Sequence, residues 1–255
     1  MKFLLSLLSF SLFSLFASAA TKNVLVTGYW PPTNEMLREL SPKEGANWKG
    51  KNWRGMGYDV YAYFPENTGQ DGIGVGDFRV DFASVYNDFM KYTGELKPVA
   101  ILSFGRGTGP WELERSFPAH FTEMFRSGKI PSLVGTQVLY PIPPSLGLAH
   151  DRWSSLPLEK MRVAVGSLGD RGLSPRIDYT GGAGDFLCGF LGYLETWYHD
   201  QHDDLADPAY NQAAGFIHVN GDLPKAKASM EASLEALLTS LAGNLARNSA
   251  AAAAK

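Results

Sequence analysis

The stretch KPVAILSF, residues 97–104, indicates the fold more clearly than any other. It is a short apolar run without polar alternation, which is typical of a strand buried on both faces of a sheet. Before it, residues 78–92 space apolar side chains by three and four positions, as an amphipathic helix does. After it comes the glycine-rich segment GRGTG, residues 105–109. Since α/β proteins place their sites in loops at the carboxyl ends of parallel strands, this loop is a candidate site.

Further apolar runs alternate with amphipathic stretches along the chain. The runs predicted to be strands are residues 23–28, 58–64, 161–165 and 214–219, and the stretches predicted to be helices are residues 184–198 and 225–245. Strand–helix–strand order with short connections favours parallel pairing with helices on both faces of the sheet. We therefore expect an α/β fold, a three-layer α/β/α sandwich with a mostly parallel central sheet.

Composition excludes several classes of protein. Of the 255 residues, 45% are hydrophobic and 19% are charged, which excludes a disordered chain. The net charge of −3 supplies no basic field for nucleic acid, so a nucleic-acid partner is not expected. Cys188 is the single cysteine, which excludes an intrachain disulfide and a cysteine-based structural zinc site.

The N-terminus has the pattern of a secretory signal peptide. Lys2 precedes an apolar run over residues 3–16, and small residues at 17–20 provide a cleavage site. We expect residues 1–20 to be removed and the mature protein to be secreted or periplasmic, with no membrane contact after cleavage. Residues 21–247 are then one domain, and the alanine-rich residues 248–255 are predicted to be a flexible tail. The sequence indicates no oligomeric state.

Two residues combine into a possible nucleophile and base. Cys188 follows the glycine-rich turn at 181–184 and lies in the first turns of a predicted helix, where an anionic thiolate is stabilised. His218 lies near the end of a predicted apolar strand. Each residue alone is more often an inert core side chain. Together they are a candidate thiol nucleophile and its base, and their separation of 30 positions suffices for a helix and a returning strand.

The segment WELER, residues 111–115, supplies candidate third members. A carboxylate beside an imidazole orients it, as in a catalytic triad. Both Glu112 and Glu114 are available, although a glutamate on the surface or at a helix cap is commoner in general.

These segments, in this order, resemble the pyroglutamyl peptidase I family of cysteine peptidases. The specific motifs are AGDFLC (183–188) and GFIH (215–218), supported by VLVTGY (24–29) and by SFGRG followed by ELER. The resemblance implies that Cys188 attacks the amide carbonyl, that His218 transfers the proton, and that Glu114, which precedes Arg115, holds the imidazolium. It also implies a peptide substrate and no cofactor or metal. Backbone amides at the start of the Cys188 helix, with Arg106 nearby, are the expected oxyanion site.

The sequence departs from the family pattern around the predicted site. Gly189 replaces the usual asparagine after the cysteine, and Asn220 stands where a proline is usual. In the family, two phenylalanines of the opening turn flank the pyroglutamyl ring, and here those positions are Tyr29 and Pro32. We expect Tyr29 and Trp30 to form one wall of the substrate pocket. The resemblance thus supports the catalytic residues better than the substrate.

Two other classes of function remain open at this point. One is an exported peptide-binding protein on the same scaffold that retains the three residues without turnover, and thiol reactivity separates it from the peptidase. The other is a metal-dependent hydrolase that uses His199 and His202 in the segment HDQHDD (199–204), although a solvated helix end is the favoured interpretation.

Overall fold

The computed structural model describes residues 22–66, 72–121, 129–133, 138–139, 150–180 and 183–253. The predicted signal peptide, residues 1–20, lies outside the described residues. Within the described ranges, no helix has the length and apolar character needed to cross a membrane.

The centre of the molecule is a six-stranded sheet. Its strands, in spatial order, are β11 (Pro175–Asp178), β6 (Trp111–Glu114), β12 (Ala213–Val219), β5 (Ala100–Arg106), β1 (Lys22–Tyr29) and β2 (Tyr58–Tyr63). All neighbouring strands pair in parallel except β6 and β12, which are antiparallel. The KPVAILSF run therefore forms a central strand, and the mostly parallel α/β architecture expected from the sequence is confirmed.

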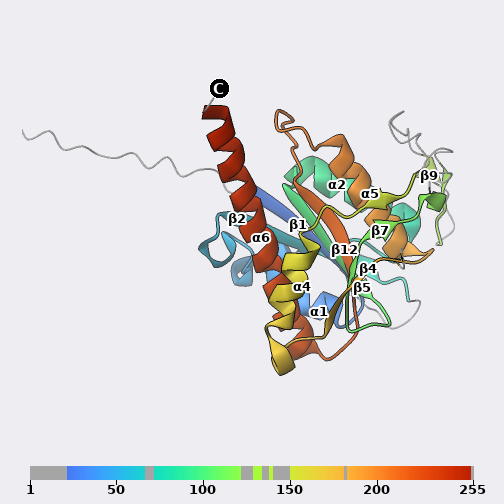
Figure 1. The fold of residues 1–255 in the computed structure, drawn as a ribbon. Helices are drawn as coiled ribbons and strands as arrows, with labels where there is room; N and C mark the ends of the chain where they lie inside the picture. The colour runs from blue at the N-terminus through green and yellow to red at the C-terminus, as the bar shows by residue number, and fades with distance from the viewer. Residues whose placement is uncertain are drawn as a thin grey trace, which may run out of the picture.

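Helices cover both faces of this sheet (Figure 1). The helices are α1 (Thr33–Leu37), α2 (Phe82–Leu96), α4 (Leu158–Gly166), α5 (Leu187–Gln201) and α6 (Leu223–Ala253). One buried cluster packs α1, α4 and α6 against the sheet, and a second packs α2 and α5 against its other face. We call the second face the α5 face.

Short elements complete the described chain. The strand pairs are β3 (Pro65–Glu66) with β4 (Val75–Gly76), β7 (Ser116–Phe117) with β10 (Arg152–Trp153), and β8 (Lys129–Ile130) with β9 (Val138–Leu139). The 3₁₀ helices are η1 (Arg38–Leu40), η2 (Pro42–Asn47), η3 (Trp53–Gly55), η4 (Ala119–Phe121) and η6 (Gly169–Arg171).

Three sequence expectations about these elements need correction. Residues 161–165, predicted as a strand, belong to helix α4, because Leu158, Met161 and Val165 are spaced for one helical face and are buried in the cluster that contains α6. The predicted helix from residue 78 begins only at Phe82, where the Asp81 side chain caps the backbone N–H of Ser84 at 3.0 Å. Helix α6 continues to Ala253, beyond residue 245 where the predicted helix ended, because alanine is the strongest helix former.

Two helical glycines offer a matched test of this packing. A Cβ atom added to Gly192 of α5 would lie 2.1 Å from the ring of buried Phe117, whereas one added to Gly243 of α6 meets nothing within 4 Å. We expect Gly192→Ala to lower the free energy of unfolding by about 1–3 kcal/mol through overpacking. Gly243→Ala should raise it by about 1 kcal/mol, because it removes the helix penalty of glycine. Urea unfolding measures both, and equal effects in the two variants would contradict the described packing.

Candidate active site

Three secondary structure elements bring the predicted nucleophile, base and orienting carboxylate together. Cys188 is the second residue of helix α5, His218 is the penultimate residue of β12, and Glu114 is the last residue of β6. Cys188 and His218 lie on the α5 face near the carboxyl ends of the parallel strands β5 and β12. Sequence reasoning thus selected three residues that are neighbours in space although up to 104 positions separate them.

A buried hydrogen bond joins His218 to Glu114. The Nδ1 atom of His218 lies 2.7 Å from Oε1 of Glu114, and the Glu114 residue is 1% exposed. Burial raises the pKa of the Glu114 carboxyl, and the hydrogen bond and charge of His218 oppose that rise. With Glu114 on Nδ1, the Nε2 atom of the imidazole is left to exchange a proton with a substrate.

The Cys188 thiol is the second partner of His218. Burial lowers the pKa of His218, but the hydrogen bonds and charges of Cys188 and Glu114 outweigh that effect and raise the pKa to about 9. The protonated imidazole is therefore the favoured form at neutral pH. The thiol is half-buried and stands in the first turn of α5, where the positive end of the helix dipole stabilises an anion.

The glycine-rich segment after β5 lets the backbone approach these side chains closely. A Cβ atom added to Gly105 would lie 2.7 Å from Sγ of Cys188, and one added to Gly107 would lie 2.5 Å from Cβ of His218. Neither position has room for a side chain without displacing Cys188 or His218. The glycine-rich segment 105–109, which the sequence indicated as a candidate site, thus brings its backbone against both side chains.

The structure separates the two glutamates of the WELER segment. Glu112 accepts a hydrogen bond of 2.9 Å from the backbone N–H of Gly109 and forms an ion pair with Arg176. It therefore tethers the glycine-rich segment, whereas Glu114 holds the imidazole. Because both side chains lie on one face of the same short strand, spacing alone did not distinguish these roles.

The glycine after the cysteine has a local cause. A Cβ atom added to Gly189 would lie 1.9 Å from the carbonyl oxygen of Gly184, so the turn before α5 packs directly on this position. Gly184 itself has a φ of +81°, a conformation that favours glycine. This departure from the family pattern belongs to the turn that leads into the helix of Cys188.

The three predicted substrate-binding residues lie in different surroundings. Tyr29 is 3% exposed and packs in the core of the α5 face, paired with Gly105 of β5, so its ring does not form an exposed wall. Trp30 is half-buried, and its indole lies beside Gly74, where an added Cβ would meet it at 2.9 Å. Arg106 follows Gly105, and because side chains alternate along a strand it points to the opposite face, where it lines a cavity of about 380 Å³ with Pro32 and Leu223. The structure does not bring Arg106 to Cys188.

The histidines considered as metal ligands have local partners. Nδ1 of His202 lies 2.8 Å from Oδ2 of Asp207, and Nδ1 of His199 lies 3.1 Å from the carbonyl oxygen of Asn211. Within the ranges that the structure describes, no group of three or more His, Cys, Asp or Glu side chains is arranged to hold a metal ion.

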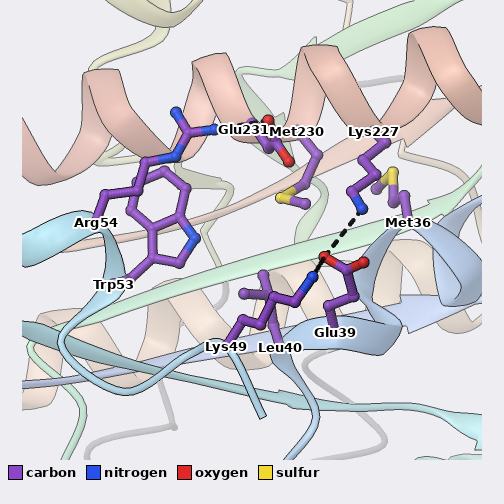
Figure 2. Close-up of a pocket in the computed structure, with 9 residues that line it drawn as sticks. All are labelled: Met36, Glu39, Leu40, Lys49, Trp53, Arg54, Lys227, Met230 and Glu231. Atoms are coloured by element: carbon purple, nitrogen blue, oxygen red, sulfur yellow. Dashed lines mark hydrogen bonds and ion pairs between the residues drawn. The ribbon is translucent and has the colours of Figure 1, made fainter. Parts of the chain in front are cut away.

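A separate cavity of about 170 Å³ lies between η1, η3 and helix α6 (Figure 2). Its charged side chains neutralise one another: Glu39 pairs with Lys49 at 3.1 Å and with Lys227 at 3.0 Å. Figure 2 shows Arg54 lying over Trp53 and reaching toward α6, where it pairs with Glu231 at 2.7 Å. These pairs fasten the loop to α6 on the face opposite Cys188, so this cavity is not the active-site candidate.

Comparisons with known proteins agree with the architecture. The pyrrolidone carboxyl peptidase of the hyperthermophile Pyrococcus furiosus matches with a TM-score of 0.55 at 21% identity, over 86% of this chain and 99% of that one. Bacillus amyloliquefaciens pyroglutamyl peptidase I matches with a TM-score of 0.54 at 17% identity, over 86% of this chain and 97% of that one. Neither the protein-family models nor the curated proteins contain a match. The resemblance seen in the sequence motifs is therefore confirmed at the level of the fold: this chain folds as the pyroglutamyl peptidases I do.

Proposed function

We propose that this protein is a cysteine peptidase that removes an N-terminal pyroglutamyl residue, or a closely related one, from peptides. The observation that carries the proposal is the chain of contacts from the Cys188 thiol through His218 to Glu114. Its fold, which is that of the pyroglutamyl peptidases I, supports this substrate class over other peptides. The predicted signal peptide would place the activity outside the cytoplasm, and this stays a prediction.

In the proposed reaction, the Cys188 sulfur attacks the carbonyl carbon of the scissile amide while His218 holds the thiol proton. Backbone N–H groups at the start of α5 stabilise the oxyanion. The C–N bond then breaks as the imidazolium gives its proton to the leaving amine, which leaves a thioester on Cys188. Water, deprotonated by His218, hydrolyses the thioester and releases the N-terminal residue as a free acid. Glu114 keeps the imidazole oriented throughout.

Removing the nucleophile or the base tests the mechanism directly. We expect Cys188→Ala and His218→Ala to lower kcat/KM for a pyroglutamyl fluorogenic amide by at least about 10³-fold. Both variants should keep the circular dichroism spectrum of the parent protein. The same assay with free aminoacyl amides checks the substrate class. Full activity in either variant would refute the mechanism, and an unreactive Cys188 in the parent protein would favour the inactive binding protein.

The two glutamates of β6 provide a matched pair for the orienting role. Glu114→Gln should lower kcat by about 10²–10⁴-fold, because a neutral amide stabilises the imidazolium less and allows the wrong tautomer. Glu112→Gln should cost much less, since the Glu112 carboxylate accepts from the Gly109 backbone and pairs with Arg176, whereas Glu114 holds Nδ1 of the imidazole. In the parent protein, activity should fall as the pH rises through the His218 pKa of about 9, because the leaving amine then lacks its proton donor. In Glu114→Gln this alkaline limb should move to lower pH. An unmoved limb would contradict the role of Glu114.

Trp30 is the accessible aromatic candidate for the substrate wall. We expect Trp30→Ala to raise KM for pyroglutamyl amides about tenfold, because one aromatic contact is worth about 0.5–1.5 kcal/mol beyond its buried area. Tyr29→Phe removes a buried hydroxyl that has no hydrogen-bond partner among the described residues, so its effect on KM should be smaller. Steady-state kinetics on both variants compare the two effects. A larger rise in KM for Tyr29→Phe would reverse the assignment.

A further inference from the structure

A fully buried glutamate lies on the helix that carries the nucleophile. Glu195 of α5 is 0% exposed and follows Cys188 by seven positions, which is two helical turns along the same face. It takes no part in the contacts among Cys188, His218 and Glu114. Sequence reasoning missed it, although a lone glutamate inside the apolar segment FLGYLETWY is itself unusual.

Glu195 is held by hydroxyl groups from the sheet. The Ser103 hydroxyl donates a hydrogen bond to Oε1 of Glu195, and the Thr27 hydroxyl donates to Ser103 Oγ at 2.7 Å. Ser103 precedes Gly105 by two positions on β5, so it lies on the same face as the glycine that contacts Cys188. The cluster Thr27–Ser103–Glu195 therefore connects β1, β5 and α5 beneath the nucleophile.

The surroundings of Glu195 favour its uncharged form. In the described part of the chain, no cation pairs with its carboxyl group, and its Oε2 atom has no hydrogen-bond partner. Burial raises the pKa of Glu195 well above its ordinary range, and the Ser103 hydrogen bond opposes that rise. An unpaired buried charge costs far more free energy than one hydrogen bond from a hydroxyl returns.

The Tyr29 hydroxyl lies within electrostatic range of both Glu195 and Cys188. Burial, followed by the charges of Cys188, Glu195 and Asp88, raises the pKa of Tyr29 well above its ordinary range. The Tyr29 hydroxyl itself is buried and has no hydrogen-bond partner among the described residues. An ionised Glu195 would place an unpaired negative charge in this buried interior, which is costly.

We propose that Glu195 is a positioning residue for Cys188: its uncharged carboxyl group, held by Ser103, seats α5 on β5 at the depth at which the thiol reaches His218. The inference rests on the proposed function in one respect, namely that Cys188 is the nucleophile. It adds a requirement that the residue at position 195 accept a hydrogen bond while remaining neutral.

The test compares Glu195→Gln, Glu195→Met and Ser103→Ala in the purified protein. The rate of Cys188 alkylation by iodoacetamide, measured across pH, reports the thiol and its imidazole without any substrate. Kinetics on a pyroglutamyl fluorogenic amide separate kcat from KM, and urea unfolding reports stability. The parent protein should lose stability as the pH rises from the unfolded-state pKa of Glu195 toward its raised native value, and Glu195→Gln should remove that loss.

We expect Glu195→Gln to keep the alkylation profile and kcat of the parent protein. Glu195→Met should lower both by up to about 100-fold with KM unchanged, as displacement of a catalytic group does, and Ser103→Ala should have an intermediate effect. If Glu195→Met does not fold, Ser103→Ala alone decides the outcome. A parent-like alkylation profile in the folded Met variant, or in Ser103→Ala when the Met variant does not fold, would overturn the inference, as would a Gln variant as impaired as Met. If the parent protein cleaves no pyroglutamyl amide but the alkylation differences persist, the proposed function fails and the positioning role stands.

Discussion

The hydrogen bond between His218 and Glu114 is the constraint on which the candidate site depends, because it joins β12 and β6, the antiparallel neighbours in the six-stranded sheet. In a purely parallel sheet, residues near the carboxyl ends of all strands would face the site. Here β6 starts at that edge and runs in the opposite direction to β12. Its last residue, Glu114, therefore lies deeper in the sheet. The carboxylate is therefore buried behind the imidazole, where water does not compete for its hydrogen bond.

Close approach of the backbone is the second requirement of this geometry. Gly105 and Gly107 stand where any side chain would collide with Cys188 or His218, and Gly189 stands where one would collide with the turn before α5. At these three positions the helix, the central strand and the loop after it meet through glycines. Gly189, which replaces the asparagine usual in the family, is thus compatible with the arrangement of Cys188 and His218, since it serves the packing of the turn before α5.

The fold was largely predictable from the sequence, because the buried strands β5 and β12 and the helices α2, α5 and α6 have clear apolar patterns. The mistaken strand at residues 161–165 shows the limit: a five-residue apolar run does not distinguish a strand from a helix, and packing against α6 decided it. Cys188 and His218 were predictable from their motifs. The choice between Glu112 and Glu114 and the face toward which Arg106 points depend on strand register, which no local pattern encodes.

Two buried glutamates of the α5 face, Glu114 and Glu195, show how partners set the state of a carboxyl group. Burial raises the pKa of both. Glu114 faces an imidazole that accepts a proton readily, so the pair can carry opposite charges and their attraction offsets part of the cost of burial. Glu195 faces Ser103, which can donate a hydrogen bond but cannot become a cation. The uncharged carboxyl group is therefore the more stable form there. One carboxyl group is thus suited to stabilising a protonated imidazole, and the other to holding a helix without adding charge. This difference follows from a single partner side chain in each case, and it explains how a half-buried thiol can share its face of the sheet with Glu114 and Glu195.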